Sequence, residues 1–329
     1  MTKKIIITTD FSSKLKLFNL NKKIVSILKK KHKDIEVKKI NPKKIKLDTK
    51  TSIYWGTRVN DKIVDFFPNL RWIHFGSVGV DKLSYKKIKE KNIIVTNSKL
   101  INTDSIFNLI FLYLLDTTKK FLINKKSSIQ NRAKYEKVFL KTQDLHGKKI
   151  LVLGYGNVAK KIHNFSKFFK LNTNFFSRRK NILKKDKKLY IGYKKLIHSF
   201  KNYDVVINLL PNNVFNKNFL NQKVFSKLKK NVSLILVSRL ETINLIKLKL
   251  FLKKNKNSSC YIDTIATKDN SKIIREIRKL SNVFISPHIG GYSHGYWFKQ
   301  LDLFNTNLSL FKKKKKLINV VKISKHNFS

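Results

Sequence analysis

Two glycines and an alanine at a fixed spacing give the first sign of chemistry in the sequence. GYGNVA (154–159) matches the pattern Gly-x-Gly-x-x-Ala. In this pattern Gly154 permits a tight turn, Gly156 lets the backbone approach a pyrophosphate, and Ala159 lets a helix pack close to a strand. The pyrophosphate would lie at the positive end of that helix. A turn with a purely structural role is the alternative. If the loop binds a dinucleotide, the predicted contacts are Gly154, Tyr155, Gly156, Asn157 and Val158.

The segment that ends the next predicted strand bears on which dinucleotide would bind. An acidic residue at this point hydrogen-bonds the ribose hydroxyls of NAD. The sequence instead has Ser177, Arg178 and Arg179, and guanidinium groups suit the 2′-phosphate of NADP. Because the whole chain is basic, both arginines could also be ordinary surface charges. The missing acid favours the first interpretation, so NADP(H) is the predicted cofactor, with NAD(H) as the alternative.

Alternating apolar and helical segments indicate how these residues are positioned. Most predicted strands are followed by an amphipathic or lysine-rich helix, an order typical of parallel sheets covered by helices. We therefore predict an α/β protein with two Rossmann-like, doubly wound sheets, the second with six strands. Helices are predicted over 22–34, over 103–121, where the helix is largely buried, and over 293–315. The predicted strands are 3–9, 51–57, 70–76, 92–98, 149–153, 172–177, 203–211, 231–238, 258–265 and 282–288.

The composition limits the class of protein. The chain has 329 residues, of which 42% are hydrophobic, enough for two domains with separate cores. A single cysteine, Cys260, excludes an intrachain disulfide and fits a reducing compartment. No apolar run approaches the roughly 20 residues of a membrane span, and the N-terminal run is too short for a signal peptide. We expect a cytoplasmic protein with no membrane partner and no metal site.

The net charge of +54 allows two interpretations. Lysine is spread over the whole chain together with Asn, Ile, Phe and Tyr, whose codons are A/T-rich, so a base bias of the genome is sufficient. Selection for an anionic partner is the alternative, although basic residues that bind nucleic acid gather on one face or in an arm. We expect no specific nucleic-acid partner. The run KKKKK at 312–316 is predicted to be a solvated helix end.

The segments around the glycine loop resemble the D-isomer-specific 2-hydroxyacid dehydrogenases, especially their glyoxylate/hydroxypyruvate reductase branch. The resemblance implies a flavodoxin-like substrate domain, residues 1–100 plus 296–329, with an inserted NAD(P)-binding Rossmann domain, residues 101–295. Six segments carry it, in the order and spacing of the family: LRWIHFGSVGVDKL (70–83), NIIVTNS (92–98), YDVVINLLPNN (203–213), LILVSRLETI (234–243), YIDTI (261–265) and NVFISPHIGGYS (282–293).

The resemblance implies a role for each matching residue. His288 would be the general acid when a 2-oxo acid is reduced and the base in the reverse reaction. Arg239 would bind the substrate carboxylate and polarise the carbonyl. Asp263 would orient the nicotinamide carboxamide. Backbone amides of the substrate domain would also bind the carboxylate, at Ser77, Val78 and Gly79. The remaining cofactor contacts would be Leu210, Pro211 and Ser238.

Three positions depart from the family's pattern. Lys268 stands where the family pairs its histidine with a glutamate, and a one-residue insertion would let Asp269 take that place, so Asp269 is a further catalytic candidate. Leu240 stands where the family has glycine, and Asn108 replaces a glutamate of the interdomain helix.

These departures leave two hypotheses about function. The first is an NAD(P)-dependent reductase of a small 2-oxo acid of the glyoxylate or hydroxypyruvate kind. The second is a catalytically impaired relative that acts as a nucleotide-binding or regulatory module. Under either hypothesis the resemblance implies a homodimer, formed through the cofactor domains and the segment around 121–147.

Overall fold

The chain, seen in a computed structural model, divides into two compact units. Met1–Ile101 and Ser293–Ser329 form the first unit, and Asn102–Tyr292 form the second. Each unit contains one parallel sheet with helices on its faces, which confirms the predicted α/β class. The structure describes residues 4–11, 20, 22–41, 44–57, 61–80, 85–122, 136, 142–178, 190–264, 267 and 269–321.

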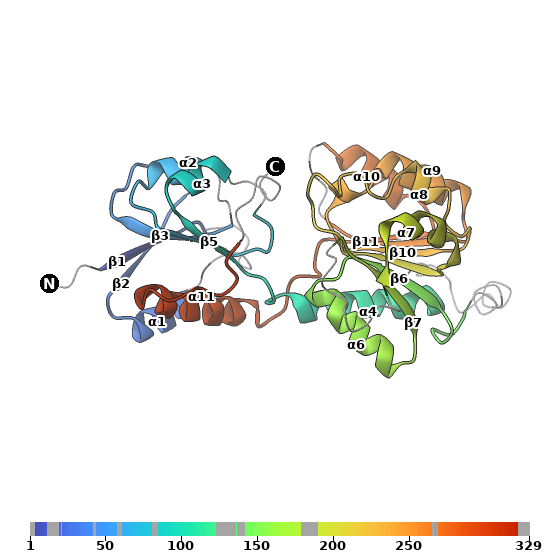
Figure 1. Ribbon diagram of the computed structural model, residues 1–329, viewed down its shortest axis with the longest axis horizontal. Helices are drawn as coiled ribbons and strands as arrows, with labels where there is room; N and C mark the ends of the chain where they lie inside the picture. The colour runs from blue at the N-terminus through green and yellow to red at the C-terminus, as the bar shows by residue number, and fades with distance from the viewer. Residues whose placement is uncertain are drawn as a thin grey trace. The chain divides into compact units, whose positions relative to one another are not determined.

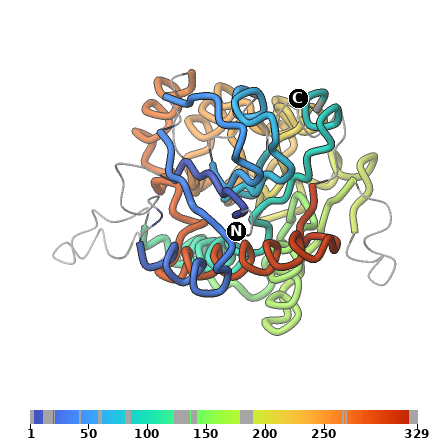
Figure 2. The backbone as a smooth tube through the Cα atoms, turned by 90° about the vertical axis from the view of Figure 1, so that its left-hand side faces the viewer, coloured from blue at the N-terminus to red at the C-terminus, as the bar shows by residue number. Residues whose placement is uncertain are grey.

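The first unit is a five-stranded sheet covered on both faces. Its strands are β1 (Ile5–Thr9), β2 (Ile35–Lys39), β3 (Thr51–Gly56), β4 (Trp72–Phe75) and β5 (Ile94–Asn97), and its helices are α1 (Lys22–Lys31), α2 (Asp61–Phe66), α3 (Tyr85–Glu90) and α11 (Tyr296–Lys312). The strands pair in the order β2-β1-β3-β4-β5. α2 and α3 cover one face, and α1 and α11 cover the other (Figure 1). Figure 2 shows α1 beside α11.

Aromatic stacking holds α11 on the sheet of the first unit. Phe304 of α11 stacks on Trp55 and Trp72, with ring centroids 4.0 and 5.1 Å apart, and all three side chains are fully buried. At the end of α11, Lys312 forms an ion pair with Asp34. The run of lysines at 312–316 therefore lies at a helix end, where Lys312 is half-buried and the other four lysines are exposed.

The second unit is a seven-stranded sheet, also covered on both faces. Its strands are β6 (Lys149–Leu153), β7 (Asn172–Phe176), β8 (Tyr190–Ile191), β9 (Val205–Asn208), β10 (Ser233–Leu236), β11 (Ser259–Asp263) and β12 (Val283–Ser286), and its helices are α4 (Thr103–Lys119), α6 (Asn157–Phe168), α7 (Tyr193–Ser199), α8 (Gln222–Phe225), α9 (Leu245–Lys254) and α10 (Ser271–Arg278). The strands pair in the order β12-β11-β10-β9-β6-β7-β8. α4 and α6 cover one face, and α7 to α10 cover the other (Figure 1).

The strand order reverses direction within this sheet, next to β6. The chain runs from β6 outward to β7 on one side, and β9 then pairs with β6 on the other side. In open α/β sheets, ligands bind beyond the carboxyl ends of the strands at such a reversal. The loops after β6, β7, β9, β10, β11 and β12 all leave the sheet at these carboxyl ends because the strands are parallel.

Two short edge strands correct the sequence prediction. β2 occupies Ile35–Lys39 directly after α1, where the sequence predicts a helix to 34 followed by no strand. Its sequence, IEVKK, has only two apolar residues, and most of its side chains are partly or fully exposed. β8 adds a seventh strand to the predicted six and spans two residues, too few for an apolar pattern to show.

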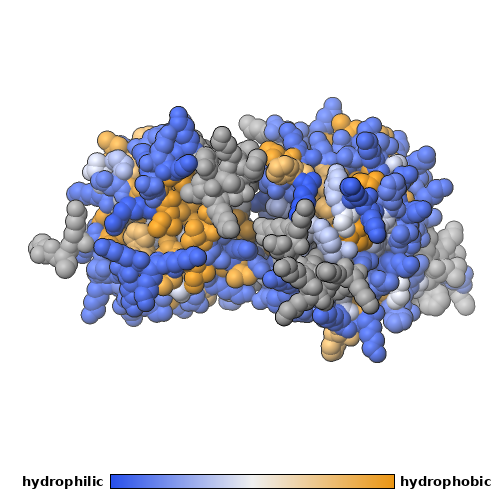
Figure 3. All heavy atoms as spheres, in the orientation of Figure 1, coloured by the Kyte–Doolittle hydropathy of each residue, from blue (hydrophilic) through white to orange (hydrophobic). Residues whose placement is uncertain are grey.

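The surface of both units is mainly polar on the face seen in Figure 3, where hydrophilic residues predominate. Within the part of the chain that the structure describes, no helix combines the length and apolarity needed to cross a bilayer. α4 buries one face only, and Leu112 and Leu115 on its other face are 49% and 42% exposed. Most of the predicted dimer segment, 123–135 and 137–141, lies outside the described residues.

Candidate active site

The turn after β6 requires a glycine at its first position. Gly154 has φ +105°, a backbone conformation that only glycine adopts without strain. Its N–H donates to the carbonyl of Phe176 at 2.8 Å, which ties the turn to the end of β7. A Cβ at Gly154 would lie 2.9 Å from the carbonyl oxygen of Leu209. The tight turn expected from the sequence is therefore enforced by the neighbouring strand β9.

The second glycine faces open space at the start of α6. Gly156 precedes α6 with φ −93°, and no side chain caps the helix. A Cβ built there would meet nothing within 4 Å, so packing within the protein does not require glycine at this position. Asn157 and Val158 begin the helix half-buried, and Ala159 is fully buried against the sheet. An uncapped helix N-terminus with nearby free volume suits an anionic group.

The end of β7 presents one arginine whose guanidinium is held in place. Arg178 donates to the carbonyl of Phe215 and lies over the rings of Tyr193, Phe215 and Phe219, at 5.9, 5.6 and 5.8 Å from their centroids. Ser177 is 7% exposed, and its carbonyl accepts from the hydroxyl of Tyr190 on β8. The predicted contact Arg179 lies outside the described residues.

The loops after β9 and β10 are joined by a small polar network. The Asn208 amide donates to the Thr242 hydroxyl at 2.9 Å, and the Ser238 hydroxyl lies 3.1 Å from the same oxygen. Thr242 in turn donates to the carbonyl of Arg239 at 2.7 Å. Of the two residues predicted after β9, the Leu210 side chain is buried in the core and Pro211 is exposed.

Arg239 lies at the carboxyl edge of β10 with its side chain exposed. The next residue, Leu240, is 7% exposed and packs in the core of the second unit, which explains how a leucine is accommodated where the related family has glycine. Burial raises the pKa of the Tyr292 hydroxyl, and the positive charge of Arg239 opposes that shift.

His288 occupies a strained position in that loop. Its φ is +56°, in the left-handed region that non-glycine residues seldom adopt. The Nδ1 atom lies 3.4 Å from the carbonyl oxygen of Asp263 and 4.0 Å from its carboxylate. The side chain is 36% exposed. Asp263 and His288 thus come together although 25 residues separate them in sequence, because β11 and β12 pair with Asp263 opposite Ser286.

The carboxylate of Asp263 is buried and holds the histidine loop. It accepts from the backbone N–H groups of Ile289 and Gly290, each at 2.9 Å, and from the hydroxyl of Ser286. Ser286 accepts from the hydroxyl of Tyr113 on α4 at 2.7 Å. Neither Ser286 nor Tyr113 is predicted from the sequence, since a serine in a strand and a tyrosine in a buried helix read as ordinary packing residues.

Asp269 is placed differently from its predicted role. It is exposed in the turn before α10, and among the described residues the carboxylate within 4.0 Å of His288 belongs to Asp263. Lys268, the residue at the family's glutamate position, lies outside the described residues. The structure therefore brings a carboxylate to His288, but from the strand β11 rather than from the following loop.

The predicted substrate loop of the first unit follows β4. The Ser77 hydroxyl donates to the carbonyl of Gly79 at 2.9 Å, and the Asn97 amide donates to the carbonyl of Val78 at 2.8 Å. Within the described part of the chain, the backbone N–H groups of Ser77, Val78 and Gly79 make no hydrogen bond. Three consecutive unpaired amides at the carboxyl edge of a sheet can bind an anion.

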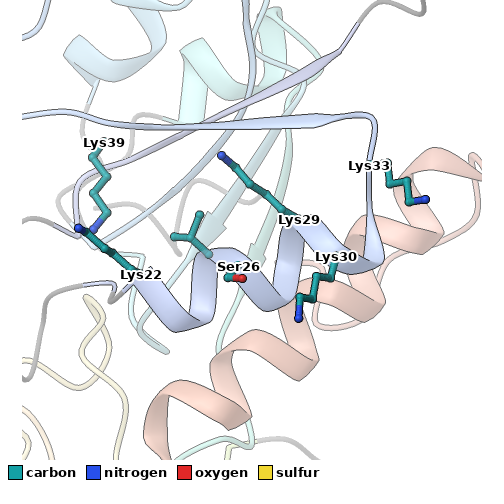
Figure 4. Close-up of a pocket in the computed structure, with 7 residues that line it drawn as sticks. Lys22, Ser26, Lys29, Lys30, Lys33 and Lys39 are labelled. Carbon is teal, nitrogen blue, oxygen red and sulfur yellow. The ribbon is translucent and has the colours of Figure 1, made fainter.

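A groove on the first unit lies apart from all predicted site residues. It has a volume of about 670 Å³ and lies between α1 and β2, where lysines surround Val25 and Ser26 (Figure 4). The ammonium groups point in several directions in Figure 4 and converge on no single point. The groove is therefore an exposed basic surface, and none of the residues predicted from motifs lines it. The lysines are Lys22, Lys29, Lys30, Lys33 and Lys39.

Comparison with known proteins gives a family and a set of relatives. The sequence model described as "D-isomer specific 2-hydroxyacid dehydrogenase, NAD binding domain" matches residues 111–290. A glyoxylate reductase of Pyrococcus horikoshii is 26% identical over 283 residues, 82% of this chain and 83% of the relative. A hydroxypyruvate reductase of Thermotoga maritima is 25% identical over 236 residues, 71% of this chain and 75% of the relative.

Solved structures show the same fold. An NADPH-dependent glyoxylate/hydroxypyruvate reductase of Sinorhizobium meliloti, in complex with NADP and malonate, has a TM-score of 0.78 at 18% identity, with 98% of each chain covered. An NAD-bound 3-phosphoglycerate dehydrogenase of Entamoeba histolytica has a TM-score of 0.76 at 14% identity, covering 97% of this chain and 99% of its own. The family match covers more than half of the chain, and the chain belongs to the D-isomer-specific 2-hydroxyacid dehydrogenases.

Proposed function

We propose that the protein reduces a small 2-oxo acid, of the glyoxylate or hydroxypyruvate kind, to the 2-hydroxy acid with a reduced nicotinamide cofactor. The observation that carries this proposal is the arrangement at the ends of three adjacent strands. Arg239 follows β10, Asp263 ends β11 and His288 follows β12. A cation, a buried carboxylate and an imidazole at the carboxyl ends of adjacent strands are the groups that carbonyl reduction of an acid requires.

The glycine loop would hold the cofactor, which supplies the hydride when bound. The uncapped N-terminus of α6 and the free volume at Gly156 fit a pyrophosphate. Arg178 supports a preference for NADP(H), because its aromatic neighbours fix the guanidinium at the end of β7. Such an arginine can form charge-assisted hydrogen bonds to a 2′-phosphate. NAD(H) remains the alternative cofactor.

Arg239 would bind the substrate carboxylate and draw electron density from the carbonyl. Its exposed side chain, just after the carboxyl end of β10, supports this role. In the first unit, the unpaired amides of Ser77, Val78 and Gly79 form a separate candidate site for a carboxylate. A guanidinium binds a carboxylate through two parallel hydrogen bonds, which an ammonium does not reproduce.

His288 would protonate the carbonyl oxygen as it becomes a hydroxyl. Its Nδ1 side faces Asp263, which leaves Nε2 for the substrate. Asp263 takes over the orienting part that a glutamate plays in the family pattern, while its role toward the nicotinamide carboxamide stays a prediction. Asp269 is exposed and unpaired with His288 among the described residues, so we assign the orienting role to Asp263 rather than to Asp269.

Paired substitutions test this assignment. His288→Asn should lower kcat by about 10²–10⁴-fold, the usual contribution of a general acid. His198→Asn, an exposed histidine on α7 of the same unit, should leave kcat unchanged. If both variants turn over glyoxylate or hydroxypyruvate like the wild type, His288 is not the acid. If the wild type binds NADPH but reduces neither acid, the protein is better described as a nucleotide-binding module than as a reductase.

We further propose a homodimer formed through the second unit. Leu112 and Leu115 lie exposed on α4, and Phe168 at the end of α6 is 81% exposed, an apolar surface of the kind that marks interfaces. Leu112→Glu should shift the molecular mass in solution from dimer toward monomer. Leu250→Glu, at an equally exposed leucine of α9, is the control. A monomeric wild type, measured by light scattering, would contradict the proposal.

A further inference from the structure

Resting on the proposed role of His288, we propose that Tyr113 and Ser286 are positioning residues that act on His288 through Asp263. The hydroxyl of Tyr113 donates to Ser286, and Ser286 donates to the Asp263 carboxylate. The carboxylate then fixes the two backbone amides that follow His288 in sequence. A chain of hydrogen bonds thus runs from the helix α4 to the loop that carries the acid.

The loop needs such support because His288 is strained. A residue other than glycine with φ near +56° is less stable than in its preferred backbone conformation. Three hydrogen bonds within the loop region oppose that destabilisation. His288 N–H donates to the carbonyl of Ser286 at 2.9 Å, and the amides of Ile289 and Gly290 donate to Asp263. Loss of the acceptor would free the backbone on which the imidazole is mounted.

Three hydrogen-bond donors surround the Asp263 carboxylate, and together they use both of its oxygens as acceptors. Oδ1 accepts from Ser286 and from the amide of Ile289, and Oδ2 accepts from the amide of Gly290. Asparagine would place an NH₂ group against one of these donors, and a buried donor without an acceptor is destabilising. The side chain of Asp263 is 5% exposed, so water cannot readily replace the lost acceptor.

Gly290 fits the same arrangement. A Cβ at Gly290 would lie 2.8 Å from Oδ2 of Asp263 and 3.0 Å from a methyl carbon of Leu109. Glycine at this position therefore lets the loop approach the carboxylate closely enough for the amide to donate to it. The close contact also fixes the distance between the loop and α4.

Tyr113 is a rigid donor at the start of this series of hydrogen bonds. Its side chain is fully buried and stacks on Tyr261, with ring centroids 5.2 Å apart. Burial raises the pKa of the Tyr113 hydroxyl to about 12, and the nearby Asp263 charge adds to the shift. The hydroxyl therefore remains protonated at neutral pH. With Tyr113 donating to it, the Ser286 hydroxyl keeps its own hydrogen for Asp263.

Two variants that remove single hydroxyls, Tyr113→Phe and Ser286→Ala, test the inference. Tyr203→Phe is the matched control, because Tyr203 is also a buried tyrosine of the second unit, and its hydroxyl donates to Asn174 at 3.0 Å, away from the loop. Two readouts are used. One is amide hydrogen exchange at Ile289 and Gly290, and the other is steady-state kinetics with NADPH and glyoxylate.

We expect exchange at Ile289 and Gly290 to accelerate about fivefold in Tyr113→Phe and more in Ser286→Ala, since loss of one hydrogen bond of about 1 kcal/mol corresponds to a factor of about five. kcat should fall by a similar factor while the KM for NADPH stays unchanged. Exchange in Tyr113→Phe that equals exchange in Tyr203→Phe would overturn the inference even if the enzyme is active. Faster exchange in a protein that reduces no 2-oxo acid would uphold the relay and reject only the proposed reaction.

Discussion

Replacing Gly154 by alanine should destabilise the protein, whereas replacing Gly156 by alanine should leave its stability almost unchanged and weaken cofactor binding. The two glycines lie two residues apart in one loop, and the structure gives them different reasons to be glycine. Gly154 has φ +105°, and a Cβ built there would lie 2.9 Å from a backbone carbonyl oxygen. Gly156 has φ −93°, and a Cβ built there would meet nothing within 4 Å. Comparing the two variants therefore distinguishes a glycine needed for folding from a glycine needed for cofactor binding.

Two effects determine how much Gly154→Ala should lower the free energy of unfolding. A non-glycine residue in a sparsely populated backbone region costs about 1–3 kcal/mol. The added Cβ would also lie 2.9 Å from the carbonyl oxygen of Leu209, and Leu209 itself donates to Leu153 of β6 at 2.9 Å, so relief of the contact must disturb the β6–β9 pairing. We expect a total of about 2–4 kcal/mol and a fall in Tm of about 5–10 °C.

At Gly156 the backbone is already in a region that alanine adopts freely. The free energy of unfolding should change by less than about 0.5 kcal/mol, as for an exposed substitution without contacts. A methyl group in the space predicted for the pyrophosphate should weaken NADPH binding by about tenfold or more, equivalent to about 1.4 kcal/mol. Tm from thermal unfolding and Kd for NADPH from calorimetry measure the two effects. Wild-type affinity in Gly156→Ala, or wild-type Tm in Gly154→Ala, would refute this reasoning.

Three further predictions concern other residues. Arg178→Ser should raise the Kd for NADPH by about tenfold, through loss of a charge-assisted hydrogen bond, and leave the Kd for NADH unchanged; equal losses for both cofactors would remove the basis for NADP preference. Arg239→Lys should raise KM for glyoxylate and lower kcat, because an ammonium lacks the planar fork; kinetics equal to the wild type would exclude Arg239 from carboxylate binding. His74 is fully buried, and burial lowers its pKa from 6.5 to about 3. The stability that neutral His74 contributes is complete above pH 6.5 and declines by about 1.4 kcal/mol per pH unit below it. Urea unfolding at pH 6.5 and 5 should show this slope in the wild type and a smaller slope in His74→Gln, and identical slopes would contradict it.

The sequence predicts most of the fold because its central strands are apolar runs of ordinary length. β9 and β10 are fully buried along their whole length, and such strands produce a clear signal. β2 and β8 escape prediction because edge strands need few buried side chains. Pairing to the preceding strand stabilises them, and the pattern of their own few residues does not show that pairing.

Residues of the candidate site can be predicted from the sequence where their role depends on a local motif. They cannot be predicted where their role depends on pairing between strands. The conformations of Gly154 and Gly156 follow from one short motif. The partner of His288 does not, because spacing along the chain suggests Asp269, whereas the register between β11 and β12 brings Asp263 to it. The contribution of Tyr113 and Ser286 depends on the packing of α4 against the sheet, which no local sequence pattern predicts.

We propose that this chain catalyses the reduction of a small 2-oxo acid with a nicotinamide cofactor. The most direct test is the decrease in absorbance of NADPH when purified wild-type protein is mixed with glyoxylate or hydroxypyruvate, with His288→Asn measured in parallel. We expect steady turnover by the wild type and a loss of about 10²-fold or more in the variant. NADPH binding without oxidation of the cofactor by either acid would contradict the claim.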